Sequence, residues 1–273
     1  MKIAIIGSSG PLGSYLKNNL RNLGNEVTGF SRSGFEGDRK IDVLREEPPS
    51  DILEFDAVIY SAWDTLDRSV ESQRRHAEAA IGWANRICGG TPIFVFVSTT
   101  LADSKATSNY GFFKFKAEEG VRRAGGTAIR VGLVCDDSLN FLATKFRGLK
   151  LRELLMFALG RVPVFAVSSK AVGIVVSSVL KSGYRGECFW LAGSSPTEIS
   201  EIVRYPNQKR SISLPYQVMK RTIRPLTALK GGVGPIDRLL GLVFGPQTIP
   251  LAISLRYSDQ CSDWSSSLSE FGS

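Results

Sequence analysis

The sequence predicts an α/β protein built on a doubly wound parallel sheet. Short apolar runs alternate with helix-like segments over residues 1–135, as expected for successive β-α-β units. One of these runs, IFVFVS at 93–98, is apolar at nearly every position, which is typical of a strand buried on both faces of a parallel sheet. The 273 residues suffice for one such domain with a smaller lobe attached.

The first half of the chain supplies these elements in turn. A short β-branched run at 2–6 is followed by the glycine-rich segment GSSGPLG and then by a helical stripe of leucines that stops at Gly24. Further strands are expected at 26–30, 56–60, 93–98 and 128–134, and helices at 66–88 and 110–124. His76 falls within the polar helix 66–88, and we expect it to lie on the surface of that helix.

The alternation loosens in the second half. Residues 139–161 are expected to form a basic helical excursion towards the substrate site, and 187–192 one more strand. From 194 onward the chain is rich in Pro, Gly and Arg, lacks the spacing of β-α-β units, and ends in a Ser-rich tail. We therefore predict a domain at 1–193 and a small C-terminal substrate-binding lobe with its tail at 194–273.

Composition narrows the classes of function. With 43% hydrophobic and 22% charged residues, the chain has the composition of an ordinary soluble globular protein. The four cysteines lie far apart and the chain has one histidine, so we expect no metal site, and reduced thiols in the cytoplasm. The opening MKIAIIG is too short for the core of a signal peptide, and no run approaches the roughly 18 apolar residues of a transmembrane segment.

The net charge of +8 is compatible with nucleic acid, a membrane surface or an anionic substrate. The basic residues are spread along the chain, and no nucleic-acid motif accompanies them. We therefore expect a small-molecule substrate carrying phosphate and no nucleic-acid partner, while a weak role at a membrane surface stays open.

The segment GSSGPLG has the pattern of a dinucleotide site. It places Gly7, Gly10 and Gly13 between the first strand and its helix. Gly7 permits a tight turn, Gly10 lets a pyrophosphate approach the backbone, and Gly13 allows close packing of helix on strand. The positive end of the helix dipole then faces the phosphates.

The end of the second strand favours NADP over NAD. A site for NAD has a carboxylate there, which accepts hydrogen bonds from the ribose of adenosine. This chain has Ser31 and Arg32 instead. A hydroxyl and a guanidinium suit a 2′-phosphate, whose charge a carboxylate would repel.

Seven short stretches together resemble the short-chain dehydrogenase/reductase superfamily, specifically its extended branch of NAD-dependent epimerase/dehydratase relatives. They are GSSGPLG, FSR, Asp42-Val43, Ser61-Ala62-Trp63, Ser98-Thr99, Tyr110-Gly111-x-x-Lys114 and IRVGLV, and they cover about residues 1–193. The resemblance implies a Rossmann-type fold. It also implies that the cofactor-binding residues are Gly7, Ser9, Gly10, Pro11, Leu12, Gly13, Ser31, Arg32, Asp42, Val43, Ser61, Ala62, Trp63 and Lys114.

Two Tyr-x-x-x-Lys motifs are present, Tyr110 with Lys114 and Tyr216 with Lys220. The first pair begins the helix after the fifth strand, at the sheet edge where ligands bind in such folds, and lies on one helix face. The second follows a proline in the irregular lobe. We therefore predict that Tyr110 exchanges a proton with a substrate oxygen, and that the ammonium of Lys114 lowers the pKa of the phenol.

By resemblance, Thr99 hydrogen-bonds the same substrate oxygen, with Thr100 and Ser98 as alternatives, and Lys114 holds the hydroxyls of the nicotinamide ribose. The expected activity is that of an NADP-dependent oxidoreductase on a carbonyl/alcohol couple of a nucleotide sugar or phosphorylated keto-sugar. The alternatives are a nucleotide-sugar epimerase and a non-enzymatic NADP-binding module, and a homodimer is compatible with each.

Three features set the chain apart from relatives in the extended branch. Tyr110 follows Thr100 at a spacing of only ten positions, where that branch has a longer insertion. The stretch RVGLVCDD lacks the proline and the glycine expected around that strand end. Thr99 is followed by Thr100-Leu101-Ala102 rather than by the Asp-Glu pair of sugar-nucleotide dehydratases, so we expect no dehydration. The basic residues expected near the substrate are Lys145, Arg147, Lys150, Arg152, Arg161, Lys209 and Arg210.

Overall fold

The computed structural model describes residues 1–34, 37–134, 163–193 and 196–198, and the single residues 217 and 221. Its centre is a seven-stranded sheet in the order β10-β6-β5-β4-β1-β2-β3, with every neighbouring pair parallel. The strands of this sheet are β1 (Lys2–Ile6), β2 (Glu26–Ser31), β3 (Arg39–Lys40), β4 (Ala57–Tyr60), β5 (Ile93–Thr99), β6 (Thr127–Val131) and β10 (Cys188–Leu191). The predicted parallel sheet is confirmed.

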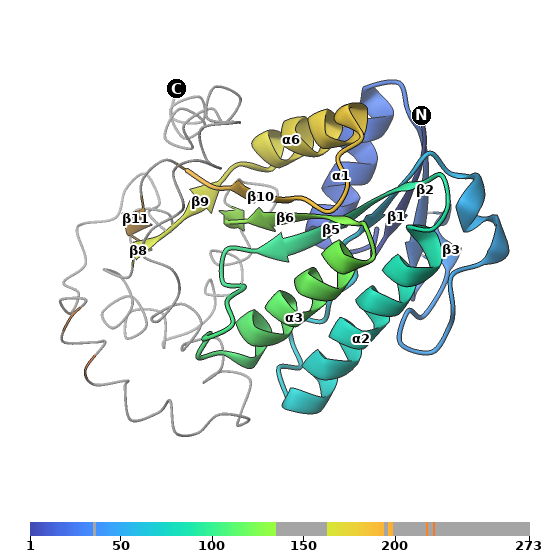
Figure 1. Cartoon of the computed structure of the whole chain (residues 1–273). Coiled ribbons are helices and arrows are strands. Elements are labelled where there is room, and N and C mark those ends of the chain that lie inside the picture. Colours follow the sequence, from blue (N-terminus) through green and yellow to red (C-terminus); the bar gives the residue numbers. More distant parts are fainter. Residues whose placement is uncertain (35–36, 135–162, 194–195, 199–216, 218–220, 222–273) are drawn as a thin grey trace, which may run out of the picture.

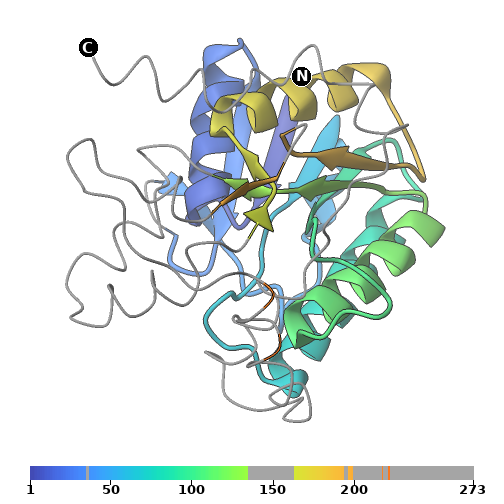
Figure 2. The same ribbon diagram turned by 90° about the vertical axis from the view of Figure 1, so that its left-hand side faces the viewer.

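Helices cover both faces of the sheet (Figures 1 and 2). They are α1 (Pro11–Asn22), α2 (Val70–Ile87), α3 (Asn109–Arg123) and α6 (Ser169–Ser182). Helices α1 and α6 pack on one face, and α2 and α3 on the other. The fold is therefore doubly wound, of the Rossmann type. Smaller elements are a 3-10 helix (Ser50–Glu54), the parallel pair β7 (Leu133–Val134) and β9 (Ala166–Val167), and the antiparallel pair β8 (Pro163–Val164) and β11 (Thr197–Glu198).

The alternation of side chains in β1 shows why both faces are needed. Ile3 and Ile5 belong to the hydrophobic core under α1 and α6. Ala4 and Ile6 belong to the separate core under α2 and α3. All four are fully buried, so this central strand has no face towards water, as parallel strands in doubly wound folds require.

Serine caps fix where three of the helices begin. The hydroxyls of Ser69, Ser108 and Ser168 accept hydrogen bonds from backbone N–H groups in the first turns of α2, α3 and α6, respectively. Helix α1 instead has Pro11 at its first position, where the missing N–H costs nothing.

The structure corrects two expectations about elements and adds a helix. Helix α2 begins at Val70 rather than at 66. The strand expected at 128–134 is two strands, because Gly132 donates to Leu191 in the main sheet while Leu133 donates to Phe165 outside it. Helix α6 was not predicted at all, whereas the strand expected at 187–192 is β10.

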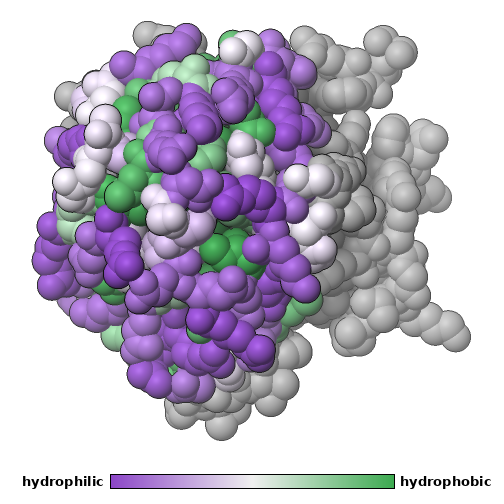
Figure 3. Space-filling view, turned by 90° about the vertical axis from the view of Figure 1, so that its right-hand side faces the viewer, coloured by the Kyte–Doolittle hydropathy of each residue, from purple (hydrophilic) through white to green (hydrophobic). Residues whose placement is uncertain are grey.

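Several expectations fall outside the described residues. These are the helical excursion at 139–161, most of the lobe at 194–273, the pair Tyr216 and Lys220, and the seven basic residues expected near the substrate. Within the described ranges, every helix is too short or too polar to cross a membrane. The face seen in Figure 3 is largely hydrophilic, with hydrophobic residues in small separate groups.

Candidate active site

The glycine-rich turn between β1 and α1 is packed too closely for side chains at two of its glycines. Gly7 has φ +86°, and a Cβ there would lie 2.6 Å from the backbone nitrogen of Ala62. A Cβ on Gly13 would lie 2.2 Å from the carbonyl oxygen of Gly7. A Cβ on Gly10 would be tight but tolerable, at 3.4 Å from the same oxygen. The turn therefore brings the first turn of α1, which holds no acidic residue, close to the carboxyl end of β1.

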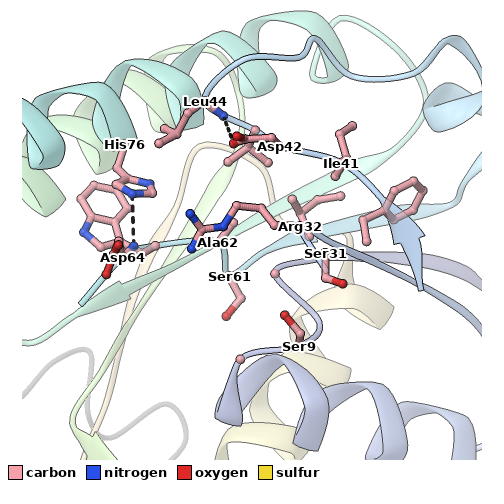
Figure 4. A pocket seen from close by; sticks show the side chains of 16 residues that line it. Ser9, Ser31, Arg32, Ile41, Asp42, Leu44, Ser61, Ala62, Asp64 and His76 are labelled. Carbon is pink, nitrogen blue, oxygen red and sulfur yellow. Dashed lines mark hydrogen bonds between the residues drawn. The ribbon is translucent and has the colours of Figure 1, made fainter. Parts of the chain in front are cut away.

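A cavity of about 160 Å³ opens at this edge of the sheet (Figure 4). Four segments that are distant in the sequence form most of its wall, namely the glycine-rich turn, the end of β2, the segment after β3 and the segment after β4. Its lining comprises Ile6, Gly7, Ser9, Gly10, Phe30, Ser31, Arg32, Ile41, Asp42, Val43, Leu44, Ser61, Ala62, Trp63, Asp64 and His76. Most of the residues predicted to bind cofactor thus meet around one cavity. Pro11, Leu12 and Gly13 lie in the adjoining first turn of α1.

The end of β2 places a hydroxyl and a guanidinium at the cavity. Ser31 is buried, and its hydroxyl has no hydrogen-bond partner among the described residues. Arg32 follows it, is exposed, and lines the cavity (Figure 4). An unpartnered hydroxyl beside a guanidinium is suited to phosphate oxygens, which accept charge-assisted hydrogen bonds.

Asp42 is held in the cavity wall by its own local contacts. Its Oδ1 accepts a hydrogen bond of 3.1 Å from the N–H of Leu44, and its Oδ2 lies 3.5 Å from Nε of Arg45. Val43 is buried beside it. This arrangement fixes a carboxylate at the cavity, where it can accept a further hydrogen bond.

His76 contradicts the expectation of a surface position. It is 5% exposed, and it lines the cavity. Its ring stacks on Trp63 at 5.4 Å between centroids, and its Nε2 accepts a hydrogen bond from the N–H of Asp64 (Figure 4). Burial lowers the pKa of His76 to about 4, and the charges of Lys114 and Arg32 act in the same direction, whereas that of Asp64 opposes them. The polar residues around His76 concealed its burial, because the first turns of α2 bury Gln73 and His76 rather than apolar side chains.

Trp63 connects the cavity to the predicted catalytic residues. Its indole Nε1 donates to Gln73 at 2.8 Å, which fixes the ring. The ring lies edge-on to Tyr110 at 6.4 Å between centroids. The ammonium of Lys114 lies 4.1 Å from the ring centroid. A single side chain of the cavity wall therefore touches both members of the Tyr-x-x-x-Lys motif.

Tyr110 lies in the first turn of α3, near Thr99 at the carboxyl edge of the sheet. Burial raises the pKa of the phenol, and the charge of Arg68 and the hydroxyl of Thr99 act against that rise. The guanidinium carbon of Arg68 lies 4.4 Å from the centroid of the Tyr110 ring. Arg68 is thus a cation beside the phenol that the sequence did not point to.

Lys114 is oriented differently from the expectation. Its ammonium donates to the carbonyl of Val97 at 2.8 Å and lies over the rings of Trp63 and Phe96, so its described contacts do not include Tyr110. The residue is 4% exposed. Burial lowers its pKa to about 7, although Glu118 opposes the shift. An amine that titrates near neutral pH beside a cavity is typical of functional sites.

The other two hydroxyls at the end of β5 have different surroundings. The hydroxyl of Ser98 donates to Glu118 at 3.1 Å, within a buried cluster in which Arg130 also binds Glu118. Thr100 is buried, and its N–H donates to the carbonyl of Val131. Of the three candidates, Thr99 is the one whose hydroxyl acts on the pKa of Tyr110.

Comparison with known proteins gives matches in structure only. No protein-family model matches the sequence, and no curated protein matches it. A nucleoside-diphosphate-sugar epimerase from Staphylococcus aureus superposes with a TM-score of 0.64 at 13% identity, covering 98% of this chain and 99% of that one.

Two further structures are similar. A human epimerase family protein solved with NADPH gives a TM-score of 0.55 at 16% identity, covering 95% of this chain and 99% of that one. A dTDP-4-dehydrorhamnose reductase from Clostridium acetobutylicum gives 0.58 at 18% identity, covering 74% and 78%. At these identities the likeness establishes the fold, and at that level it agrees with the resemblance seen in the sequence.

Proposed function

We propose that this chain is an NADP-dependent oxidoreductase of the extended short-chain type, acting on a carbonyl/alcohol couple of a nucleotide sugar or another phosphorylated keto-sugar. The observation that carries the proposal is the position of Trp63, which lines the cavity beside the glycine-rich turn and touches Tyr110 and Lys114. A site for cofactor and a candidate proton donor thus share one wall. The named neighbours, two epimerase-type proteins and a reductase, support this class of chemistry.

The cofactor is NADP rather than NAD in this proposal. The close packing at Gly7 and Gly13 supports a pyrophosphate-binding turn. Ser31 and Arg32 would hold the 2′-phosphate, and Asp42 would accept a hydrogen bond from the adenine amino group. Ser61, Ala62 and Trp63 would lie beneath the ribose and phosphates.

The residues of this chain would manage the proton while a bound nicotinamide supplies or accepts hydride. Tyr110 donates its proton to the carbonyl oxygen as that oxygen becomes an alcohol, and it takes the proton back in the reverse direction. Thr99 holds the same oxygen by a hydrogen bond. Lys114 would have to leave the carbonyl of Val97 to reach a ribose hydroxyl, and a pKa near 7 makes the neutral amine available for that movement.

Hydride transfer without loss of water is the proposed reaction type. Dehydration needs an acid for the departing hydroxyl and a base for a carbon-bound proton, in addition to Tyr110. The first carboxylate after Thr99 is Asp103, which is exposed and accepts a hydrogen bond from the N–H of Lys105. Asp103 is therefore occupied by a hydrogen bond in the loop after β5, and it does not supply the acid that dehydration needs in this proposal.

A panel of nucleotide-linked keto-sugars offered with NADPH tests the reaction. The proposal expects loss of NADPH absorbance together with a product heavier by two hydrogens and no loss of water. A 4-keto-6-deoxy product from an NDP-hexose would contradict it. Cofactor that stays bound through desalting would favour the epimerase alternative, and NADP binding without any turnover would favour the non-enzymatic module.

The setting proposed for this activity is the cytoplasm. Both described cysteines, Cys88 and Cys188, are free, and burial raises the pKa of each thiol, to about 11 and about 12. Free thiols suit a reducing compartment, and a raised pKa makes a thiol a poor nucleophile. The division into a domain at 1–193 and a substrate lobe at 194–273, and a homodimer, are parts of the same proposal.

A further inference from the structure

A buried polar cluster lies where the glycine-rich turn, α1 and the segment after β2 meet. The hydroxyl of Ser8 donates to Oδ2 of Asp38 at 2.5 Å, and Nζ of Lys17 donates to Oδ1 of the same carboxylate at 3.0 Å. The side chains of Lys17 and Asp38 are 2% and 1% exposed. These three residues, named here the Asp38 cluster, stand outside the cavity lining itself.

Gly29 in β2 makes room for this cluster. A Cβ at Gly29 would lie 2.0 Å from Oδ1 of Asp38 and 2.7 Å from Oγ of Ser8. A glycine in the middle of a strand weakens the strand, and one explanation for such a glycine is a close approach by another group. Here the group that approaches is the carboxylate of Asp38.

Asp38 is the interior anchor of the segment that carries Arg32. Of the described residues between Arg32 and Asp38, Arg32, Ser33 and Gly37 are exposed, and only Asp38 is buried. Gly34 and Gly37 both have positive φ, +65° and +77°. Glycine restricts its own backbone less than any other residue, so we expect the buried contacts of Asp38 to matter for the backbone at these two positions.

A buried ion pair is weak evidence for stability, because the cost of removing both charges from water can exceed their attraction. The Asp38 cluster therefore calls for another explanation than stability. Its partners come from the pyrophosphate-binding turn and from α1, and its carboxylate comes from the segment that begins with Arg32. The cluster joins the two parts of the proposed cofactor site.

We propose that the Asp38 cluster is a positioning unit that holds Arg32 for the 2′-phosphate and thereby helps to set the preference for NADP over NAD. The inference rests on the proposed function, since it presupposes a nicotinamide cofactor in this cavity. Lys17 has a second effect, because it neutralises Asp38 and leaves no uncompensated carboxylate beside a turn that binds phosphate.

Releasing the segment should weaken NADPH selectively. An untethered Arg32 must be ordered when the cofactor binds, and that ordering reduces the affinity. NADH has no 2′-phosphate and does not use Arg32, so its affinity should be unaffected. The preference for NADPH over NADH is therefore the quantity to measure, rather than either affinity alone.

The test compares the dissociation constants of NADPH and NADH, by calorimetric titration, for the full chain and its variants. Asp38→Asn keeps the shape and removes the charge. The double variant Lys17→Met/Asp38→Leu removes both charges while keeping similar volumes, which avoids a lone buried ammonium. In each variant, the ratio of the dissociation constant of NADH to that of NADPH should fall by about tenfold. NADH should bind within about twofold of the wild type.

Asp51→Asn is the matched control. Asp51 forms an ion pair of 2.5 Å with Arg39 of β3, on the same segment of chain, but the partners are 40% and 44% exposed. Exposed pairs of this kind contribute little. This variant should leave the preference unchanged.

A double-mutant cycle with Arg32→Ala separates positioning from a general structural effect. If the cluster acts through Arg32, Asp38→Asn should have no further effect on NADPH once Arg32 is gone. Equal weakening of both cofactors, an unchanged preference, or effects that add to those of Arg32→Ala would each overturn the inference. If both cluster variants fail to fold, Ser8→Ala keeps the ion pair and must lower the preference in the same direction.

The same titrations separate the failure of the two proposals. A wild-type chain with no preference for NADPH contradicts the cofactor proposed above, and the inference then falls with it. A wild-type chain that prefers NADPH, with cluster variants that keep that preference, contradicts the inference alone.

Discussion

Tyr110 is the residue on which the proposed chemistry depends most. Replacing it with Phe removes only the phenol oxygen and leaves the ring between Trp63 and Arg68. We expect Tyr110→Phe to lower turnover by about 10²-fold or more, as for the loss of a general acid, with little change in NADPH affinity. Steady-state NADPH oxidation and cofactor titration measure the two effects.

Tyr216→Phe is the control for this variant, because Tyr216 belongs to the second Tyr-x-x-x-Lys motif. It should leave turnover close to that of the wild type. Loss of activity in the Tyr216 variant, with activity retained in the Tyr110 variant, would show that the choice between the two motifs is wrong.

Lys114 should contribute less to the free energy of unfolding at neutral pH than at alkaline pH. Its pKa is about 7 in the folded chain and about 10.4 in the unfolded chain. Above about pH 10.4 the amine is neutral in both states, so its burial carries no charge penalty and its contribution to stability is greatest. That contribution falls as the pH drops from about 10.4 to about 7 and is constant below. Lys114→Met should therefore raise the free energy of unfolding at pH 7, by about 1–3 kcal/mol after allowing for the lost hydrogen bond to Val97.

Urea unfolding of the wild type and the Met variant at pH 7 and near pH 10 checks the prediction for Lys114. The gain from Met should shrink towards the higher pH. A Met variant that is less stable than the wild type at pH 7 would mean that the ammonium is well satisfied in the core and keeps an ordinary pKa.

His76 should make the free energy of unfolding depend on pH in the acid range. Its pKa falls from about 6.5 in the unfolded chain to about 4 on folding, so its contribution is fully present above about pH 6.5 and is lost as the pH falls through about 4. The loss amounts to at most roughly 3 kcal/mol, because burial disfavours the charged imidazolium; protonation also ends the hydrogen bond that Nε2 accepts from the N–H of Asp64. Because the chain has one histidine, its imidazole NMR signals report this titration directly. His76→Gln should remove that part of the acid dependence, and a measured pKa near 6.5 would contradict the buried, stacked position.

At the scale of elements, α2 and α3 pack so closely that Gly120 has no room for a side chain. A Cβ on Gly120 would lie 2.4 Å from Cγ1 of Ile81 on α2. Gly120→Ala should therefore force the helices apart and lower stability by about 1–3 kcal/mol, in spite of the better helix propensity of Ala.

Gly82→Ala is the matched control for Gly120, because Gly82 lies on α2 with nothing near its missing Cβ. This change should raise stability by about 0.5–1 kcal/mol. Thermal unfolding of both variants tests this pair of predictions, and the melting temperature should fall for Gly120→Ala and rise for Gly82→Ala. Similar changes in the two variants would contradict the close packing of α2 on α3.

The elements that the sequence predicted well are those with strong local patterns. The buried runs at 2–6, 56–60 and 93–98 became β1, β4 and β5. Helix α6 escaped prediction because half of its buried positions hold valine, which favours strands. Its clearest helix signals are the residues at its two ends, Ser168 and Gly183.

At the scale of the whole molecule, the sequence motifs predicted which segments would meet at the cavity, because the carboxyl ends of parallel strands share one edge. They could not predict contacts that depend on side-chain direction. The burial of His76 under Trp63, the turn of Lys114 towards Val97 and the pairing of Lys17 with Asp38 are of this kind. Such contacts join residues whose sequence neighbourhoods carry no sign of them.

The central claim is that this cavity binds NADP through Arg32, and titration of NADPH and NADH against the wild type and Arg32→Ala tests it most directly. A charge-assisted contact to the 2′-phosphate contributes about 1–3 kcal/mol. The wild type should therefore bind NADPH roughly 5- to 150-fold more tightly than NADH. Arg32→Ala should abolish most of that difference and leave NADH unaffected. Equal affinities of the wild type for the two cofactors, or a preference that survives the loss of Arg32, would contradict the account.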